Sequence, residues 1–152
     1  MISFSTVVSN LQESALSLTA VNTVDFGSID KLDADQQNAV YPYVFFRPLT
    51  SPGIAFGQPM IGGRRLNFEM YVMDIPKLTD SDMTAVMSNC EQIGYDVCSK
   101  FYDGEPAYEA TNTLSVSNII PVFEAFQDRV GGWVFNITVE TDANGISFCN
   151  RV

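Results

Sequence analysis

The stretch from Arg65 to Val72 alternates polar and apolar side chains, and it constrains the fold more than any other part of the chain. Its apolar members occupy every second position: Leu66, Phe68, Met70 and Val72. This period of two predicts a strand of an antiparallel sheet that buries one face and leaves the other face polar. Such a sheet needs a second layer over its apolar face, and the rest of the chain must supply that layer.

Two stretches have the apolar spacing of amphipathic helices. The first runs from about residue 3 to 17, and the second runs from about 82 to 102, after cap candidates at 80–82 and before Gly104. The Met and Cys side chains on the second stripe are expected to lie in the core. We expect both helices to pack on one face of the sheet.

Three further strands are predicted, at 41–48, at 114–126 with a break at Pro121, and at 133–140. Between the first helix and the first of these strands, residues 22–38 are rich in Asp and predict an acidic loop with one short helical turn. A Ca²⁺ site there is disfavoured because the spacing of an EF-hand loop is missing. The sequence therefore predicts an α+β fold: an antiparallel sheet of about four strands with two main helices packed on one face.

The chain length of 152 residues suits one domain with a core of its own. We expect a single domain over residues 1–152, with an extended Gly-rich loop near 50–65 that leads into a strand and not into a phosphate-binding helix. Only 17% of the residues are charged. That proportion suggests either a surface covered by other chains or a large apolar core, and the two alternatives stay open.

The charge excludes several functions. The net charge is −10, from 18 acids and 8 bases, so tight binding of DNA or of an anionic membrane is not expected. The chain has no histidine, which removes His-based nucleophile systems and imidazole metal sites. Paired carboxylates remain for a hydrolase, but the candidates Asp74, Glu124 and Asp128 are equally explained by turns and strand ends.

The cysteines do not indicate a metal or redox site either. Cys90 and Cys98 would lie about 12 Å apart along a helix, too far for a disulfide, and no CxxC motif is present. We therefore expect free thiols, no cofactor and no metal. The first residues lack a charged, apolar leader, and no stretch is apolar enough to cross a bilayer, so neither a secretory signal nor a membrane span is expected.

Five motifs in order along most of the chain resemble the tail terminator, or tail completion (neck), proteins of tailed bacteriophages. They follow an N-terminal helix and are Tyr41–Phe45 as a YPxV strand, Leu66–Asp74 as an F-x-V-x-D strand, the helix with Ser88, Cys90, Ile93 and Asp96, the run Phe123–Trp133, and Cys149 near the end. Many relatives continue from that cysteine into proline, whereas Asn150–Val152 follow here, which leaves the role of the tail end open.

The resemblance implies a structural virion protein and not an enzyme. Members of the family form a ring at the head–tail junction, commonly sixfold, that contacts connector and tail proteins while DNA passes through without specific binding. The virion, assembled in the cytoplasm of a host bacterium, is the implied location. The alternatives are a tail tube or baseplate subunit, and a small acidic carboxylate hydrolase or binding module.

Two sets of residues are candidates for this role. Subunit or partner contacts are predicted at the Gly-rich arm and at two arginines elsewhere: Met60, Ile61, Arg64, Arg65, Arg47 and Arg129. Acids facing the lumen of a ring are predicted in the acidic loop: Asp25, Asp30, Asp33 and Asp35. The same loop would also fit an outer, solvated position. Six copies at −10 each would carry roughly −60, enough to repel DNA from the wall of a passage.

Overall fold

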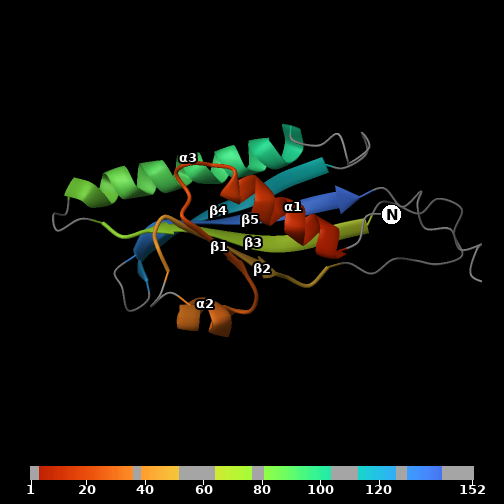
Figure 1. Ribbon diagram of the computed structural model, residues 1–152, viewed down its shortest axis with the longest axis horizontal. Helices are drawn as coiled ribbons and strands as arrows, with labels where there is room; N and C mark the ends of the chain where they lie inside the picture. Colours follow the sequence, from red (N-terminus) through yellow and green to blue (C-terminus); the bar gives the residue numbers. More distant parts are fainter. Residues whose placement is uncertain are drawn as a thin grey trace, which may run out of the picture.

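The computed structural model describes residues 4–35, 39–51, 64–76, 81–103, 113–125 and 130–141. Within them lie three helices and five strands, in the order α1 (Phe4–Leu16), β1 (Thr23–Phe26), α2 (Ile29–Asp35), β2 (Tyr43–Pro48), β3 (Arg64–Asp74), α3 (Ser81–Asp103), β4 (Thr113–Ala125) and β5 (Val130–Thr141). Helices α1 and α3 lie over one face of the sheet and α2 lies on the other face (Figure 1). The fold is therefore mixed α and β.

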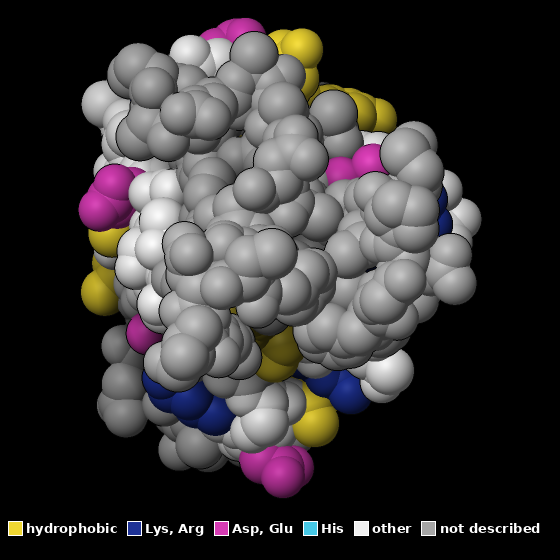
Figure 2. Space-filling model, turned by 90° about the vertical axis from the view of Figure 1, so that its right-hand side faces the viewer, with side chains coloured by type: hydrophobic (Ala, Val, Ile, Leu, Met, Phe, Trp, Pro, Cys, Tyr) yellow, Lys and Arg dark blue, Asp and Glu magenta, His cyan; other side chains and the backbone are white. Residues whose placement is uncertain are grey.

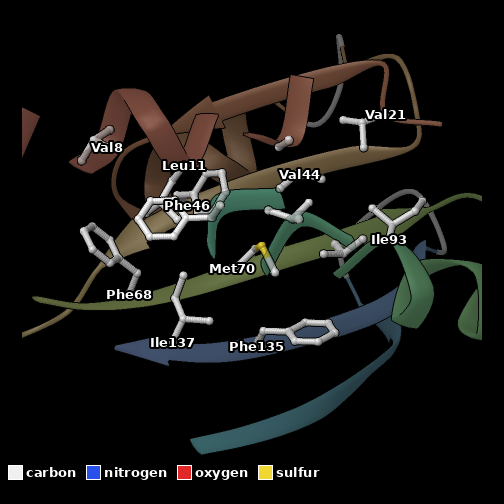
Figure 3. Packing of buried hydrophobic residues seen from close by; sticks show 14 of the residues in the cluster. Val8, Leu11, Val21, Val44, Phe46, Phe68, Met70, Ile93, Phe135 and Ile137 are labelled. Atoms are coloured by element: carbon white, nitrogen blue, oxygen red, sulfur yellow. The ribbon is translucent and has the colours of Figure 1, made fainter. Parts of the chain in front are cut away.

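The main core lies between the sheet and the two long helices. Helix α1 contributes Val7 and Leu11, and α3 contributes Cys90, Ile93 and Val97, all of them buried. The sheet contributes buried side chains that point toward the helices (Figure 3): Val44, Phe46, Phe68, Met70, Phe135 and Ile137. The alternation predicted for Arg65 to Val72 is confirmed as far as Met70, where the apolar members are the buried ones, whereas Tyr71 is buried as well, on the other face of the sheet.

The sheet has five strands in the order β1-β2-β3-β5-β4. Strands β2, β3, β5 and β4 pair antiparallel, whereas β1 pairs parallel to β2. One row of residues crosses all five strands, through Phe26, Phe46, Met70, Phe135 and Ile119. The sheet is therefore mixed, and it carries one strand more than the sequence predicted.

The additional strand lies in the segment predicted as an acidic loop. Residues 22–38 contain β1 and the seven-residue helix α2, which corresponds to the predicted helical turn. Strand β1 has only four residues, so its alternation of polar and apolar side chains is too short to distinguish a strand from a loop. Its order comes from its neighbour, because the backbone N–H groups of Thr23 and Gly27 donate to the backbone oxygens of Pro42, just before β2, and of Phe46 within β2.

The predicted break at Pro121 is wrong. Strand β4 continues through this residue, which lies opposite Trp133 of β5. A proline is tolerated here because β4 is an edge strand, where the missing N–H does not interrupt pairing on two sides. The irregularities that β4 does have are two register shifts, between Val116 and Asn118 and between Phe123 and Ala125.

Strand β5 begins at Val130, earlier than the predicted start at Trp133, and includes two glycines. A Cβ atom on Gly132 would lie 1.9 Å from the backbone oxygen of Val72. This glycine is required by the close approach of β5 to β3. In the sequence, Gly131-Gly132 predicts a turn, because a pair of glycines is more common in turns than inside a strand.

The second face of the sheet is half apolar, whereas the sequence predicted a uniformly polar one. Leu32 of α2 is fully buried against Tyr43, Phe45 and Met73. Edge-to-face ring contacts link Tyr43 to Phe45 and Phe45 to Tyr71, at 6.1 and 6.4 Å between ring centroids. The short helix α2 thus covers a small second core at one end of this face.

Candidate functional site

The other end of the second face is a strip of partly exposed polar side chains, which we call the polar strip. It consists of Arg47, Asn67, Glu69, Asn136 and Thr138, from β2, β3 and β5. They share a face because they occupy the alternate positions that the buried side chains of the same strands leave free. Two adjacent rows of the sheet hold them, Arg47–Glu69–Asn136 and Asn67–Thr138.

An ion pair and a hydrogen bond meet at Glu69. Nη1 of Arg47 lies 3.3 Å from Oε2 of Glu69, and the Tyr71 hydroxyl donates to the same oxygen at 2.6 Å. Burial, followed by the bond to Glu69, raises the pKa of Tyr71 to about 12. The pKa of Arg47 is also raised, first by the Tyr71 hydroxyl and then by the charge of Glu69. The charges of Arg47 and Glu69 offset each other, so the cluster is a hydrogen-bonded unit without net charge.

The remaining members of the polar strip are uncharged. Thr138 donates through its hydroxyl to Oδ1 of Asn67 at 2.8 Å, and Nδ2 of Asn67 donates to the backbone oxygen of Thr50 at 3.0 Å. Oδ1 of Asn136 is buried without a hydrogen-bond partner, which is uncommon in folded proteins. The polar strip thus offers amides and a hydroxyl but no excess of either charge, which suits a protein surface better than a phosphate or a metal ion.

The predicted contact residues do not gather into one patch among the described residues. Arg65 lies at the start of β3 and pairs with Glu140, with 2.7 Å between Nε and Oε1 and both side chains well exposed. Arg47 lies opposite Glu69 in the cluster described above, and Glu69 is four residues further along β3 than Arg65. Arg64 begins β3, with its side chain outside the described residues, and Met60, Ile61 and Arg129 lie wholly outside them.

The predicted lumen acids lie on β1 and α2. Asp25 is partly exposed and accepts a hydrogen bond from the Tyr43 hydroxyl at 3.1 Å. Asp30 is exposed in the first turn of α2, whereas Asp33 and Asp35 fall on the same helix with side chains outside the described residues. These acids therefore lie on two consecutive elements of the chain.

The described thiols are unsuited to nucleophilic chemistry. Cys90 and Cys98 are both free, and Cys90 is fully buried. Burial, and for Cys90 also the charge of Asp74, raises the pKa of Cys90 to about 12, and burial raises that of Cys98 to about 11. Both thiols are protonated at neutral pH, and a thiol is a far weaker nucleophile than a thiolate. The prediction of free thiols is confirmed for these two residues.

Neither a metal site nor a membrane helix emerges from the part of the chain that the structure describes. It contains no group of three acids or cysteines placed to hold a metal ion. None of its helices is both long and apolar enough to span a bilayer. Viewed from the end of the molecule (Figure 2), the coloured basic and acidic side chains lie in separate small groups around the rim.

One surface feature escaped the sequence analysis. Strand β4 forms an edge of the sheet, and no residue from Thr113 to Phe123 carries a charge. Ile120 of this strand is 49% exposed. In the sequence this surface corresponds to a run without charge in a chain of net charge −10, and the strand-forming composition of the run explains the same residues without an exposed edge.

No protein-family model and no curated protein matches this chain.

Proposed function

We propose that this protein is a structural virion component that forms a ring at the head–tail junction of a tailed bacteriophage, as a tail terminator or neck ring. DNA passes through the ring without specific binding. The ring consists of copies of this chain, six on the family pattern, and contacts connector proteins on one side and tail proteins on the other. It needs no cofactor, no catalysis and no membrane.

The observation that carries the proposal is the order of the five motifs along the chain. The YPxV motif contributes to β2 and the F-x-V-x-D motif forms most of β3, and these strands are neighbours in the sheet. The third motif lies on α3, which packs against β3 and against β5, the other neighbour of β3. The fourth motif joins the end of β4 to the start of β5. Its middle part, residues 126–129, lies outside the described residues, and so does Cys149.

The distribution of charge supports a structural role near DNA. Exposed or partly exposed acids are spread over the helices, with Glu13 on α1, Asp30 on α2, and Glu91, Asp96 and Asp103 on α3. The polar strip, in contrast, carries one Arg–Glu pair and no net charge. An acidic body repels DNA, while an uncharged surface lets copies of the same acidic chain approach one another.

Electron microscopy of the purified protein tests the proposal. We expect single rings of uniform diameter with a central opening. Long tubes would show that the subunits stack without limit and would favour a tail tube subunit instead. A gel-shift measurement at physiological salt should detect no DNA complex, because the chain has 10 more acids than bases. The proposal would be contradicted if the protein stayed monomeric at high concentration and also bound DNA tightly.

A further inference from the structure

The sheet ends in two strands that pair on one side only among the described residues, β1 and β4. All four residues of β1 are partly exposed, in contrast to the buried Tyr43–Phe46 of the neighbouring strand β2. On β4, Ser115, Asn118 and Ile120 are exposed. The two edges lie on opposite sides of the sheet, and each presents backbone groups to which a further strand can bind.

Most of the β4 edge lacks the charge that commonly protects an exposed edge against such binding. Exposed edge strands are commonly short or carry charges, especially lysine, which prevent pairing with another chain. Strand β4 has 13 residues and carries no charge from Thr113 to Phe123. Its protective features are Glu124 near its end, Pro121 and the two register shifts, and the shifts divide the edge into short lengths. A short strand therefore fits this edge better than a long one.

The strand directions favour one combination of edges. Strand β1 runs parallel to β2, and each of the next pairs, β2–β3, β3–β5 and β5–β4, is antiparallel. Strand β4 therefore runs opposite to β1. If a second copy is placed beside the first by rotation about an axis along the strands, its β1 lies antiparallel to β4. Antiparallel pairing is the more stable arrangement per residue.

We propose that the uncharged edge of β4 docks against the β1 edge of a second copy of this chain, so that the sheet continues from subunit to subunit. The inference rests on the proposed ring and identifies its subunit contact. The two edges are different surfaces, so the contact is head-to-tail, and such a contact can close into a ring. A two-fold contact of β4 with itself would give only dimers.

The positions of the two edges along the strand direction, and the charges on them, agree with this contact. Across the sheet, Asp25 of β1 lies in the row that ends at Ile120 of β4, and Phe26 lies in the row that ends at Ile119. A copy rotated without a large shift along the strands therefore brings β1 to the exposed part of β4. Asp25 is the only charged residue of β1 and already accepts the Tyr43 hydroxyl, so the contact opposes no pair of like charges.

The first experiment places a charge on the β4 edge. We expect Ile120→Lys to raise the protein concentration needed for half-maximal assembly by roughly tenfold or more, as measured by light scattering after size exclusion. The matched control is Asn89→Lys, at an exposed position of α3, which should assemble as the original chain does. Circular dichroism checks that both variants are folded. Normal assembly of folded Ile120→Lys would overturn the proposal.

The second experiment tests which edges meet. In a background without the native cysteines, the double variant Asn22→Cys and Ile120→Cys is treated with a flexible bis-maleimide. Asn22 is exposed and immediately precedes β1. A head-to-tail contact should give a ladder of covalent oligomers that ends at the size of the ring, while each single variant stays uncoupled. Dimers from the single variant Ile120→Cys would show a two-fold contact and would overturn the proposal.

The two experiments separate the failure of this inference from the failure of the proposed function. If rings form but neither the ladder nor the effect of Ile120→Lys is found, the assignment of the edges is wrong and the ring remains. If the original chain stays monomeric at every concentration and gives no ladder, both are wrong.

Discussion

At the scale of single residues, Gly94 lets α3 lie close to the sheet because it has no side chain. A Cβ atom on Gly94 would lie 2.2 Å from the ring carbons of Phe135, far inside van der Waals contact. The following residue, Tyr95, meets the same ring edge-to-face, with 5.6 Å between the ring centroids. Phe135 is itself fully buried and has no free space into which to withdraw.

We therefore expect Gly94→Ala to lower the free energy of unfolding by about 1–3 kcal/mol, measured by urea denaturation, although alanine is the better helix former. The control is Ser88→Ala, at an exposed position of the same helix, which should leave stability unchanged or slightly higher. Equal or greater stability of Gly94→Ala would show that α3 does not lie this close to β5.

Tyr71 makes a second prediction at this scale. Its pKa is raised to about 12 in the folded chain, first by burial and then by the bond to Glu69, whereas an unfolded tyrosine titrates near 10. The folded state thus favours the protonated phenol, so its contribution to stability is complete below about pH 10 and is lost as the pH rises toward 12. We expect Tyr71→Phe to cost about 1 kcal/mol at pH 7 and to reduce the decline of stability between pH 10 and 12.

The measurement is urea denaturation at several pH values, and NMR of tyrosine labelled at Cζ follows the titration of Tyr71 directly. Tyr102→Phe is the matched control, because Tyr102 is 65% exposed and its loss should not change stability at pH 7. A midpoint for Tyr71 near 10 would contradict the arrangement with Glu69.

At the scale of elements, α2 shows how a helix of seven residues is kept in place. Leu32 is fully buried against the aromatic side chains of β2, and Nζ of Lys31 donates to the backbone oxygen of Phe26 at 3.0 Å. Isolated helices of this length are not stable in water, so tertiary contacts must hold it. Among the described side chains of α2, Leu32 is the fully buried one, and Ile29 packs partly buried against the same cluster.

We expect Leu32→Ala to cost about 2–5 kcal/mol and to increase amide hydrogen exchange in α2 and β1 more than in α1. Asp30→Ala, at an exposed position of α2, is the control and should leave the exchange of β1 unchanged. If Leu32→Ala left the exchange of α2 as it was, contacts other than this leucine would have to hold the helix.

The elements also show how far the sequence predicted the fold. Strand β3 and the helices α1 and α3 follow from side-chain periodicity, because each is long and buries one regular stripe. Strand β1 does not follow from it, since its order comes from pairing with β2, which is distant in the sequence. The same holds for the candidate site: Arg47 and Glu69 are 22 residues apart in the chain, and only the register of β2 with β3 brings them together.

At the scale of the whole molecule, the net charge of −10 and the uncharged contact proposed above have opposite consequences for assembly. The repulsion between whole acidic subunits acts over roughly one Debye length, and salt shortens that range from about 30 Å at 0.01 M to about 8 Å at 0.15 M. The proposed strand pairing consists of backbone hydrogen bonds and, apart from Asp25 of β1, of uncharged side chains, and salt affects such a contact little.

Raising the ionic strength from about 0.01 to 0.15 M should therefore increase the assembled fraction at a fixed protein concentration, because repulsion falls while the contact is preserved. Mass photometry or analytical ultracentrifugation measures that fraction directly. Asn118→Asp serves as the matched variant, since it adds an acid at the edge of β4 and should make assembly depend more steeply on salt. Dissociation on raising the salt would instead show that ion pairs such as Arg65–Glu140 exchange partners between subunits and that charge attraction, not an uncharged edge, joins the copies.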